Sequence, residues 1–311
     1  MNSMDINKSF SSQTIRLKPD YEGEVVATLI ASKANFGNRK SVLYLHGYID
    51  YFFHGHLSEK FNAHCFDFYA LDLRKYGRSL LAHQHPNYCR NIEEYYEEIS
   101  IAIRQIHENG NGEVFLLAHS TGGLTAGNYM NNGQERGLVK GVIMNSPFLD
   151  FNQSNFLKTL AYLIAKPIAA GFPFAKINGA LPPTYAESIH KDFHGEWDFN
   201  LAWKPIKGFP TYFSWILAIR NAQNKLKKSN ITTPVLVMHS SSSSKLSRYS
   251  EKANCQDIVL NVEDIKSRGA KLGQKVTVLE IKNGIHDLFL SPKEVREKAF
   301  NEMFSWLEEL E

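Results

Sequence analysis

The sequence predicts an α/β fold with a mostly parallel central sheet. Short runs of apolar, β-branched and aromatic residues recur along the chain, and segments with helical spacing separate them. Strands buried on both faces of a parallel sheet show such continuous apolar runs, with crossover helices between them. Residues 93–108 show the helical pattern clearly, because isoleucines recur on one side and Asn109-Gly110 follows as a stop signal.

Eight strands are expected, and a change of pattern divides the chain. The first two are predicted to form a hairpin, and the eight segments are 14–18, 24–32, 41–45, 65–71, 114–118, 139–144, 234–239 and 275–281. Between 152 and 230 aromatic residues are dense, prolines recur and strand-like alternation is absent. We therefore predict an α/β core formed by residues 1–150 and 231–311, with a helical cap inserted at 151–230.

Composition and charge exclude several other classes of protein. Hydrophobic residues make up 43% and charged residues 22%, which argues against a disordered, collagen-like or coiled-coil chain. The 35 Lys and Arg against 32 Asp and Glu give a net charge of +3, too balanced to indicate nucleic acid as the main partner. Three cysteines without close spacing and a polar N-terminus without a signal sequence predict a cytoplasmic protein. No apolar stretch is long enough to predict a membrane span, and the oligomeric state stays open.

The most informative motif lies between Ala118 and Gly123. The residues Ala-His-Ser-Thr-Gly-Gly follow the strand 114–118 and open a segment with helical character. A serine on a tight strand-to-helix turn is held with its hydroxyl above the sheet, and small residues two before and two after it prevent collisions. Ala118 and Gly122 meet this requirement, although alanine replaces the usual first glycine. Ser120 is therefore the predicted nucleophile, and an ordinary Ser/Gly turn is the alternative.

A second motif, His46-Gly47-Tyr48, ends the strand 41–45. A loop at this point can present a backbone N–H to the negative charge that develops during acyl transfer. The backbone N–H groups of Tyr48 and Thr121 are the predicted oxyanion hole. The alternative is that His46 only satisfies a turn.

A third motif begins with Asp72-Leu73-Arg74 at another strand end. Asp72 and Arg74 are expected either to brace neighbouring loops by charge-assisted hydrogen bonds or to form a solvated turn. We assign this motif no chemistry.

His286 follows the last predicted strand and lies in a loop. A histidine at this place can accept the proton of Ser120 and return it to the leaving group. The close pairs His54/His56 and His83/His85 have no acidic or cysteine cluster beside them, so they are expected in solvated loops and no metal site is predicted.

Together these motifs resemble the α/β-hydrolase superfamily, and within it the branch of monoacylglycerol lipases, lysophospholipases and serine aminopeptidases. The resemblance rests on His46-Gly47, the Asp72 turn with Gly77-Arg78-Ser79, the turn around Ser120, and His286-Asp287, in the order of that family. It implies an eight-stranded, mostly parallel sheet, a helical cap after the sixth strand, and hydrolysis by a Ser–acid–His triad.

The chain departs from that family in the position of the acid. The family usually carries it in the turn after the seventh strand, where this chain has five consecutive serines, 240–244. The acid must orient the imidazole, so another carboxylate has to reach it. Asp257 is the predicted acid, because it lies between that turn and His286 and precedes an apolar, strand-like run. Asp264 and Asp150 are the alternatives.

The function predicted from these residues is hydrolysis of a carboxylic ester with an apolar acyl group. The expected enzyme is a lysophospholipase-like or monoacylglycerol-lipase-like esterase that forms an acyl-enzyme and needs no cofactor. Two other functions stay open. One is an aminopeptidase-like peptidase, for which cap carboxylates would bind the free amino terminus: Glu187, Asp192, Glu196 and Asp198. The other is a non-catalytic binding protein on a hydrolase scaffold, favoured by the missing acid after the seventh strand.

The cap contains many aromatic residues, which together suggest an apolar substrate group, although each is expected to serve packing. Leu157, Leu160, Ala161 and Ile164 recur at helical spacing. We expect this helix face to pack on the domain and not to contact lipid.

Overall fold

The computed structural model describes residues 10–34, 40–110, 112–177 and 182–310, and its centre is an eight-stranded sheet. The order across the sheet is β1-β2-β4-β3-β5-β6-β9-β10, with β1 antiparallel to β2, β2 antiparallel to β4, and the other neighbours parallel. The strands are β1 (Ser11–Arg16), β2 (Val26–Ser32), β3 (Lys40–Leu45), β4 (Asp67–Asp72), β5 (Glu113–His119), β6 (Val139–Asn145), β9 (Val235–Ser240) and β10 (Val276–Ile281). All eight predicted strands are present, with small shifts at their ends.

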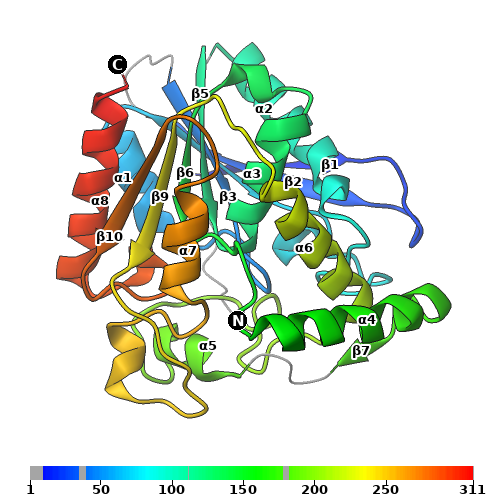
Figure 1. The fold of residues 1–311 in the computed structure, drawn as a ribbon. Coiled ribbons are helices and arrows are strands. Elements are labelled where there is room, and N and C mark those ends of the chain that lie inside the picture. The colour runs from blue at the N-terminus through cyan, green and yellow to red at the C-terminus, as the bar shows by residue number, and fades with distance from the viewer. Residues whose placement is uncertain (1–9, 35–39, 111, 178–181, 311) are drawn as a thin grey trace.

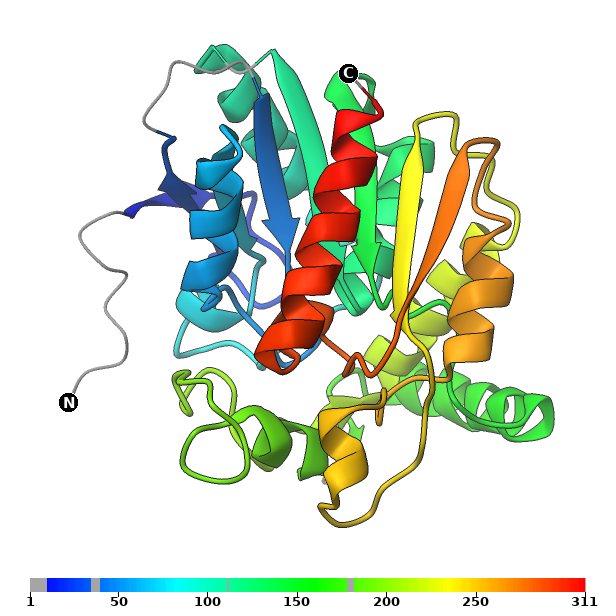
Figure 2. The same ribbon diagram turned by 90° about the vertical axis from the view of Figure 1, so that its left-hand side faces the viewer.

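Helices cover both faces of the sheet (Figures 1 and 2). One face carries α1 and α8, which bury Phe61 and Phe300 among others, and the opposite face carries α2, α3, α6 and α7. The helix expected at 93–108 begins as a short 3₁₀ turn capped by Asn91 and continues as α2. The helices are α1 (Gly55–Ala63), α2 (Tyr96–Glu108), α3 (Thr121–Asn132), α4 (Asn155–Gly171), α5 (Thr184–Ile189), α6 (Phe213–Leu226), α7 (Val262–Gly269) and α8 (Lys293–Glu308), with 3₁₀ turns at Gly77–Ser79, Ile92–Tyr95, Arg136–Leu138, Glu251–Asn254 and Leu288–Leu290.

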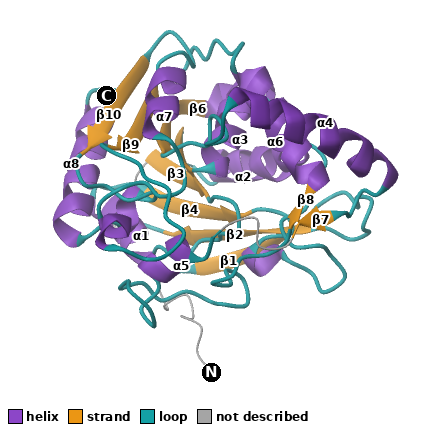
Figure 3. Cartoon of the chain, turned by 60° about the horizontal axis from the view of Figure 1, so that its bottom comes forward, coloured by secondary structure: helices purple, strands orange, loops and turns teal. Residues whose placement is uncertain are grey.

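The segment between β6 and β9 extends beyond the carboxyl ends of the parallel strands (Figure 1). It contains α4, α5 and α6, and also two short strands that pair with each other, β7 (Lys176–Ile177) and β8 (Thr211–Tyr212). Figure 3 shows these strands apart from the large sheet, on the side of α4. These two short strands were not predicted from the sequence. The last helix, α6, packs on α3 and buries Trp215 and Ile219 in the core, so we propose residues 151–230 as an insertion whose end rejoins the core layer.

The apolar face of α4 is exposed, contrary to the expectation that it packs on the domain. Leu157, Leu160 and Ile164 are about half exposed, and Phe156 is 75% exposed. The helix packs on α6 through its other side, where Ala165 is buried. Spacing alone could not distinguish the two faces, because both contain apolar residues.

The turn after β4 is a buried brace and not a solvated loop. Asp72 is fully buried and accepts hydrogen bonds from the backbone N–H of Phe52 at 2.9 Å and from Nη1 of Arg78 at 2.8 Å. Arg74 is also buried, and its Nη2 lies 2.6 Å from Oε2 of Glu98 on α2. Charge-assisted hydrogen bonds of this kind fix the loops that follow β3 and β4 relative to each other.

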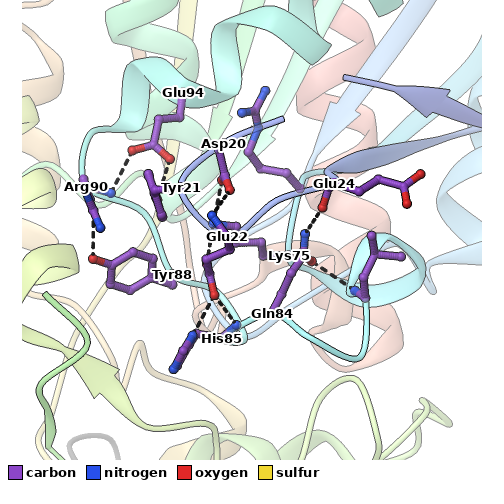
Figure 4. Close-up of polar contacts among 12 residues, drawn as sticks. Asp20, Tyr21, Glu22, Glu24, Lys75, Gln84, His85, Tyr88, Arg90 and Glu94 are labelled. Atoms are coloured by element: carbon purple, nitrogen blue, oxygen red, sulfur yellow. Dashed lines mark hydrogen bonds and ion pairs between the residues drawn. The ribbon is translucent and has the colours of Figure 1, made fainter. Parts of the chain in front are cut away.

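Lys75, the next residue, ties the β1–β2 turn to this brace (Figure 4). Its buried Nζ lies 2.7 Å from Oδ2 of Asp20 and 2.5 Å from Oε2 of Glu22. The other oxygen of Glu22 accepts from Nδ1 of His85 at 2.6 Å. The His85 ring stacks on Phe174 of the cap, with ring centroids 4.2 Å apart. One chain of contacts therefore links the hairpin, the turn after β4 and the segment that follows α4.

Each helix in the described part of the chain is too short or too polar to cross a bilayer.

Candidate active site

Ser120 occupies a strained turn between β5 and α3. Its backbone has φ 52° and ψ −115°, a conformation that non-glycine residues rarely adopt and that is typical of functional sites. The turn is held from below, since the Ser120 N–H donates to the carbonyl oxygen of Asn145 at 3.0 Å. The strand-to-helix turn predicted from the motif is confirmed.

The small residues of the motif allow a close backbone approach. A Cβ atom on Gly122 would lie 2.5 Å from the carbonyl oxygens of Leu45 and His46 at the end of β3. Only a residue without a side chain fits there. The alanine at 118 is fully buried in the sheet.

We expect Gly122→Ala to lower the free energy of unfolding by about 1–3 kcal/mol, because the new methyl group overpacks against rigid backbone. Urea unfolding of the variant measures this loss. Gly137→Ala is the matched control, since no heavy atom lies within 4 Å of the added Cβ. Equal stability of the two variants would contradict the close approach.

The structure brings the three predicted catalytic side chains into one hydrogen-bonded chain. Nε2 of His286 lies 3.1 Å from Oγ of Ser120, and Nδ1 lies 2.9 Å from Oδ2 of Asp257. Ser120 is 8% exposed, His286 3% and Asp257 0%. The Tyr185 ring of α5 meets the His286 ring edge-to-face, with centroids 5.4 Å apart. The cap therefore covers the imidazole and limits the water around it.

Asp257 is held rigidly by backbone groups. Its Oδ1 accepts from the N–H groups of Val259 and Leu260, both at 2.8 Å. Its own N–H donates to Ser242 and its carbonyl accepts from Ser244, so the serine run pairs with the acid's main chain. Residues 258–260 form bends, so the strand expected there was wrong; a turn, not a strand, fixes the carboxylate.

The two alternative acids have other partners. Asp150 contacts Lys158 at 2.7 Å, Arg220 at 2.8 Å, and Arg268. Burial raises the pKa of Asp150, but these cations outweigh it and hold the pKa below its usual value. Asp264 lies on α7, with Oδ1 3.6 Å from Nε of Arg268. Of the three carboxylates, Asp257 is the one hydrogen-bonded to His286.

The predicted oxyanion-hole residues come from two segments in close contact, the loop after β3 and the start of α3. Thr121 is the first residue of α3. Gly47, next to Tyr48, approaches the turn so closely that an added Cβ would lie 3.2 Å from Cβ of Ser120. The Tyr48 ring stacks on Trp215 of α6 at a centroid distance of 3.9 Å. The role of the two N–H groups stays a prediction.

His46 supports this loop. Its Nε2 accepts from the N–H of Leu73 at 3.1 Å, so Nδ1 carries the proton and donates to the carbonyl oxygen of Gly47 at 2.8 Å. Burial lowers the pKa of His46, against the attraction of Asp72 and Asp50. The histidine therefore joins the loops after β3 and β4.

A second polar cluster, formed by His54, Asp287 and Asn145, was not predicted from the sequence. His54 is 1% exposed, so its expected place in a solvated loop was wrong, and its Nε2 lies 3.0 Å from Oδ2 of Asp287. Asn145 donates from Nδ2 to Oδ1 of Asp287 at 2.7 Å. The sequence signal for this cluster was that Asp287 directly follows His286. Its partners His54 and Asn145 are far away in the sequence, so no local pattern indicates them. Within the described residues, no group of three or more His, Cys, Asp or Glu side chains could hold a metal ion.

The sheet order, the helices on both faces and the strained serine turn define an α/β-hydrolase fold. Residues 37–290 match the family described as serine aminopeptidase, S33, and the chain belongs to this family of hydrolases. The resemblance based on the four motifs is confirmed. No curated protein matches the chain significantly.

Solved structures of hydrolases share this fold over nearly the whole chain. The monoacylglycerol lipase of Paleococcus ferrophilus is 22% identical, with a TM-score of 0.67 over 91% of this chain and 99% of that one. A soluble variant of monoglyceride lipase from Saccharomyces cerevisiae, in complex with a substrate analogue, is 16% identical, with a TM-score of 0.70 over 96% and 95%. A carboxyl esterase from Bacillus coagulans, in complex with glycerol, is 13% identical, with a TM-score of 0.67 over 96% and 99%. At these identities the similarity is one of fold.

Proposed function

We propose that the protein hydrolyses carboxylic esters with an apolar acyl group, through Ser120, His286 and Asp257. The observation that carries the proposal is the buried hydrogen-bonded chain from Oγ of Ser120 through His286 to Asp257. An imidazole between a hydroxyl and a fixed carboxylate can activate the hydroxyl as a nucleophile.

Each residue has a defined step in this reaction. Nε2 of His286 accepts the Ser120 proton as Oγ attacks the ester carbonyl, and then donates that proton to the leaving alcohol. Asp257 keeps the proton of the neutral imidazole on Nδ1 and stabilises the imidazolium that forms. The N–H groups of Tyr48 and Thr121 bind the negative oxygen of the tetrahedral intermediate. Water then attacks the acyl-enzyme, with His286 as the base.

The aromatic residues of the cap favour a substrate with an apolar acyl group. Two aromatic rings of the inserted segment contact predicted site residues, since Tyr185 meets the His286 ring and Trp215 stacks on Tyr48. Relatives in fold include proteins named as monoacylglycerol lipase and carboxyl esterase. A lysophospholipase-like or monoacylglycerol-lipase-like esterase fits these observations.

A peptidase is the second candidate, favoured by the family description. It requires free cap carboxylates for the substrate amino terminus. Three of the four candidates already have partners. Asp198 pairs with Lys191 at 2.6 Å and Glu196 pairs with Arg296. Asp192 has Oδ2 3.8 Å from Nδ1 of His190. Ester hydrolysis also needs less assistance to its leaving group, so we place it first.

Turnover of two substrate series separates these functions. We expect the protein to hydrolyse p-nitrophenyl esters, with kcat/KM rising with acyl length, and to leave aminoacyl anilides almost intact. Ser120→Ala serves as the control for background hydrolysis. Preference for anilides with a free amino group would establish the peptidase, and turnover of neither series would favour a binding protein.

A further inference from the structure

A second buried acid–imidazole pair lies behind the proposed triad. Asp287 directly follows His286 and is 1% exposed. Its Oδ2 accepts from Nε2 of His54 at 3.0 Å, and its Oδ1 accepts from the Asn145 amide at 2.7 Å and from the Phe289 N–H at 3.1 Å. Within the described residues no lysine or arginine forms an ion pair with Asp287. A carboxylate buried in this way is costly unless its hydrogen bonds are complete.

Asn145, at the end of β6, connects this pair to the nucleophile. Its backbone carbonyl accepts from the Ser120 N–H at 3.0 Å. Its side chain donates to Asp287 and accepts from the Leu288 N–H at 3.2 Å. One residue therefore holds the serine turn by its main chain and the histidine loop by its side chain, so the Ser120–His286 distance depends on these bonds.

The surroundings leave Asp287 as a negative charge beside the His119 ring. Nε2 of His119 lies 3.9 Å from Oδ2 of Asp287, and the His119 and His286 ring centroids are 4.8 Å apart. Burial raises the pKa of Asp287, but the His119 and His54 rings and the Asn145 amide outweigh it and hold the pKa below its usual range. Burial lowers the pKa of His119 to about 4, so at neutral pH this ring is uncharged and the hydrogen bonds from His54 and Asn145 stabilise the carboxylate. Besides Asp257 on the imidazole itself, the titratable groups around the pair are His119 of β5, Tyr44 of β3, Tyr185 of α5, His56 of α1, and Asp50 in its ion pair with Lys204.

We infer that Asp287, held by His54 and Asn145, is a positioning residue for His286. It fixes the histidine loop against the serine turn and adds a second buried negative charge that favours the imidazolium formed during the reaction. The inference rests on the proposed hydrolysis and extends it, because the hydrogen bond to Asp257 alone does not fix the loop that carries the imidazole.

Asp287→Asn tests both parts of this role. We expect kcat for a p-nitrophenyl ester to fall about 10- to 100-fold, as expected for a slightly misplaced base. We also expect the acidic limb of the kcat/KM profile to move to lower pH by about 0.5 unit or more, because loss of a negative charge disfavours the imidazolium. Asp67→Asn is the matched control, since Asp67 is a buried carboxylate at the other end of the sheet, paired with Lys33 at 2.7 Å. Its profile should match the wild type.

Two variants of His54 give an independent test that does not depend on the folding of Asp287→Asn. His54→Gln keeps an N–H donor for Asp287 and should retain most of the wild-type kcat, whereas His54→Leu removes the donor and should lose as much as Asp287→Asn. Equal kcat in the two His54 variants, or an unshifted pH profile in folded Asp287→Asn, would overturn the inference. Absence of ester turnover in the wild type would instead defeat the proposed function.

Discussion

Ser120→Ala is expected to lower kcat for ester hydrolysis by about 10⁶-fold, the scale found when a triad nucleophile is removed. His286→Ala should lose nearly as much, because the hydroxyl then has no base at 3.1 Å to accept its proton. The double variant should be no worse than either single variant, since the two side chains act as a unit. Initial rates at saturating p-nitrophenyl ester measure the three losses.

The control for these variants is the histidine that precedes the nucleophile. His119 is buried, and its Nδ1 contacts the carbonyl oxygen of Asn145 at 3.1 Å, but it makes no hydrogen bond to Oγ of Ser120 among the described contacts. His119→Gln should therefore cost far less than His286→Ala. A comparable loss in the two would contradict the assignment of His286 as the base.

Asp257→Asn is expected to lower kcat by about 10⁴-fold, while KM changes little. An asparagine presents an N–H or a neutral oxygen to Nδ1, so the imidazole is no longer held with its proton on Nδ1 and its charged form loses a partner. Steady-state kinetics of the variant at several pH values measure the loss.

Asp264→Asn is the matched control for Asp257→Asn. Asp264 is a neighbouring carboxylate on α7 that faces Arg268 and not His286. It should keep wild-type kcat. If Asp264→Asn lost activity and Asp257→Asn did not, the assignment of the acid would be wrong despite the 2.9 Å contact.

The strand segments and the serine turn were predictable because their signals are local. Buried parallel strands require continuous apolar runs, and the turn at Ser120 requires small neighbours, so both leave a pattern in consecutive residues. The place of His286 followed from the same logic, because the carboxyl ends of parallel strands meet at one edge of a sheet.

Other features of the site were not predictable because they depend on distant or backbone partners. Asp257 was predicted as the acid, but the way it is held was not. The N–H groups of Val259 and Leu260 and the serine run fix it, and backbone hydrogen bonds need no particular side chain. His54 is buried and its Nε2 donates a hydrogen bond to Asp287, 233 positions away. The spacing of apolar residues in α4 predicted an apolar face. It could not predict that this face is exposed, because that depends on where α6 packs.

Covalent labelling with a fluorophosphonate, followed by mass spectrometry of the modified peptide, tests most directly whether Ser120 is an activated nucleophile. We expect one label per chain, located on Ser120, formed rapidly in the wild type and abolished in Ser120→Ala and His286→Ala. A folded wild-type protein that takes up no label, or carries it on another residue, would contradict the assignment of Ser120 as the nucleophile.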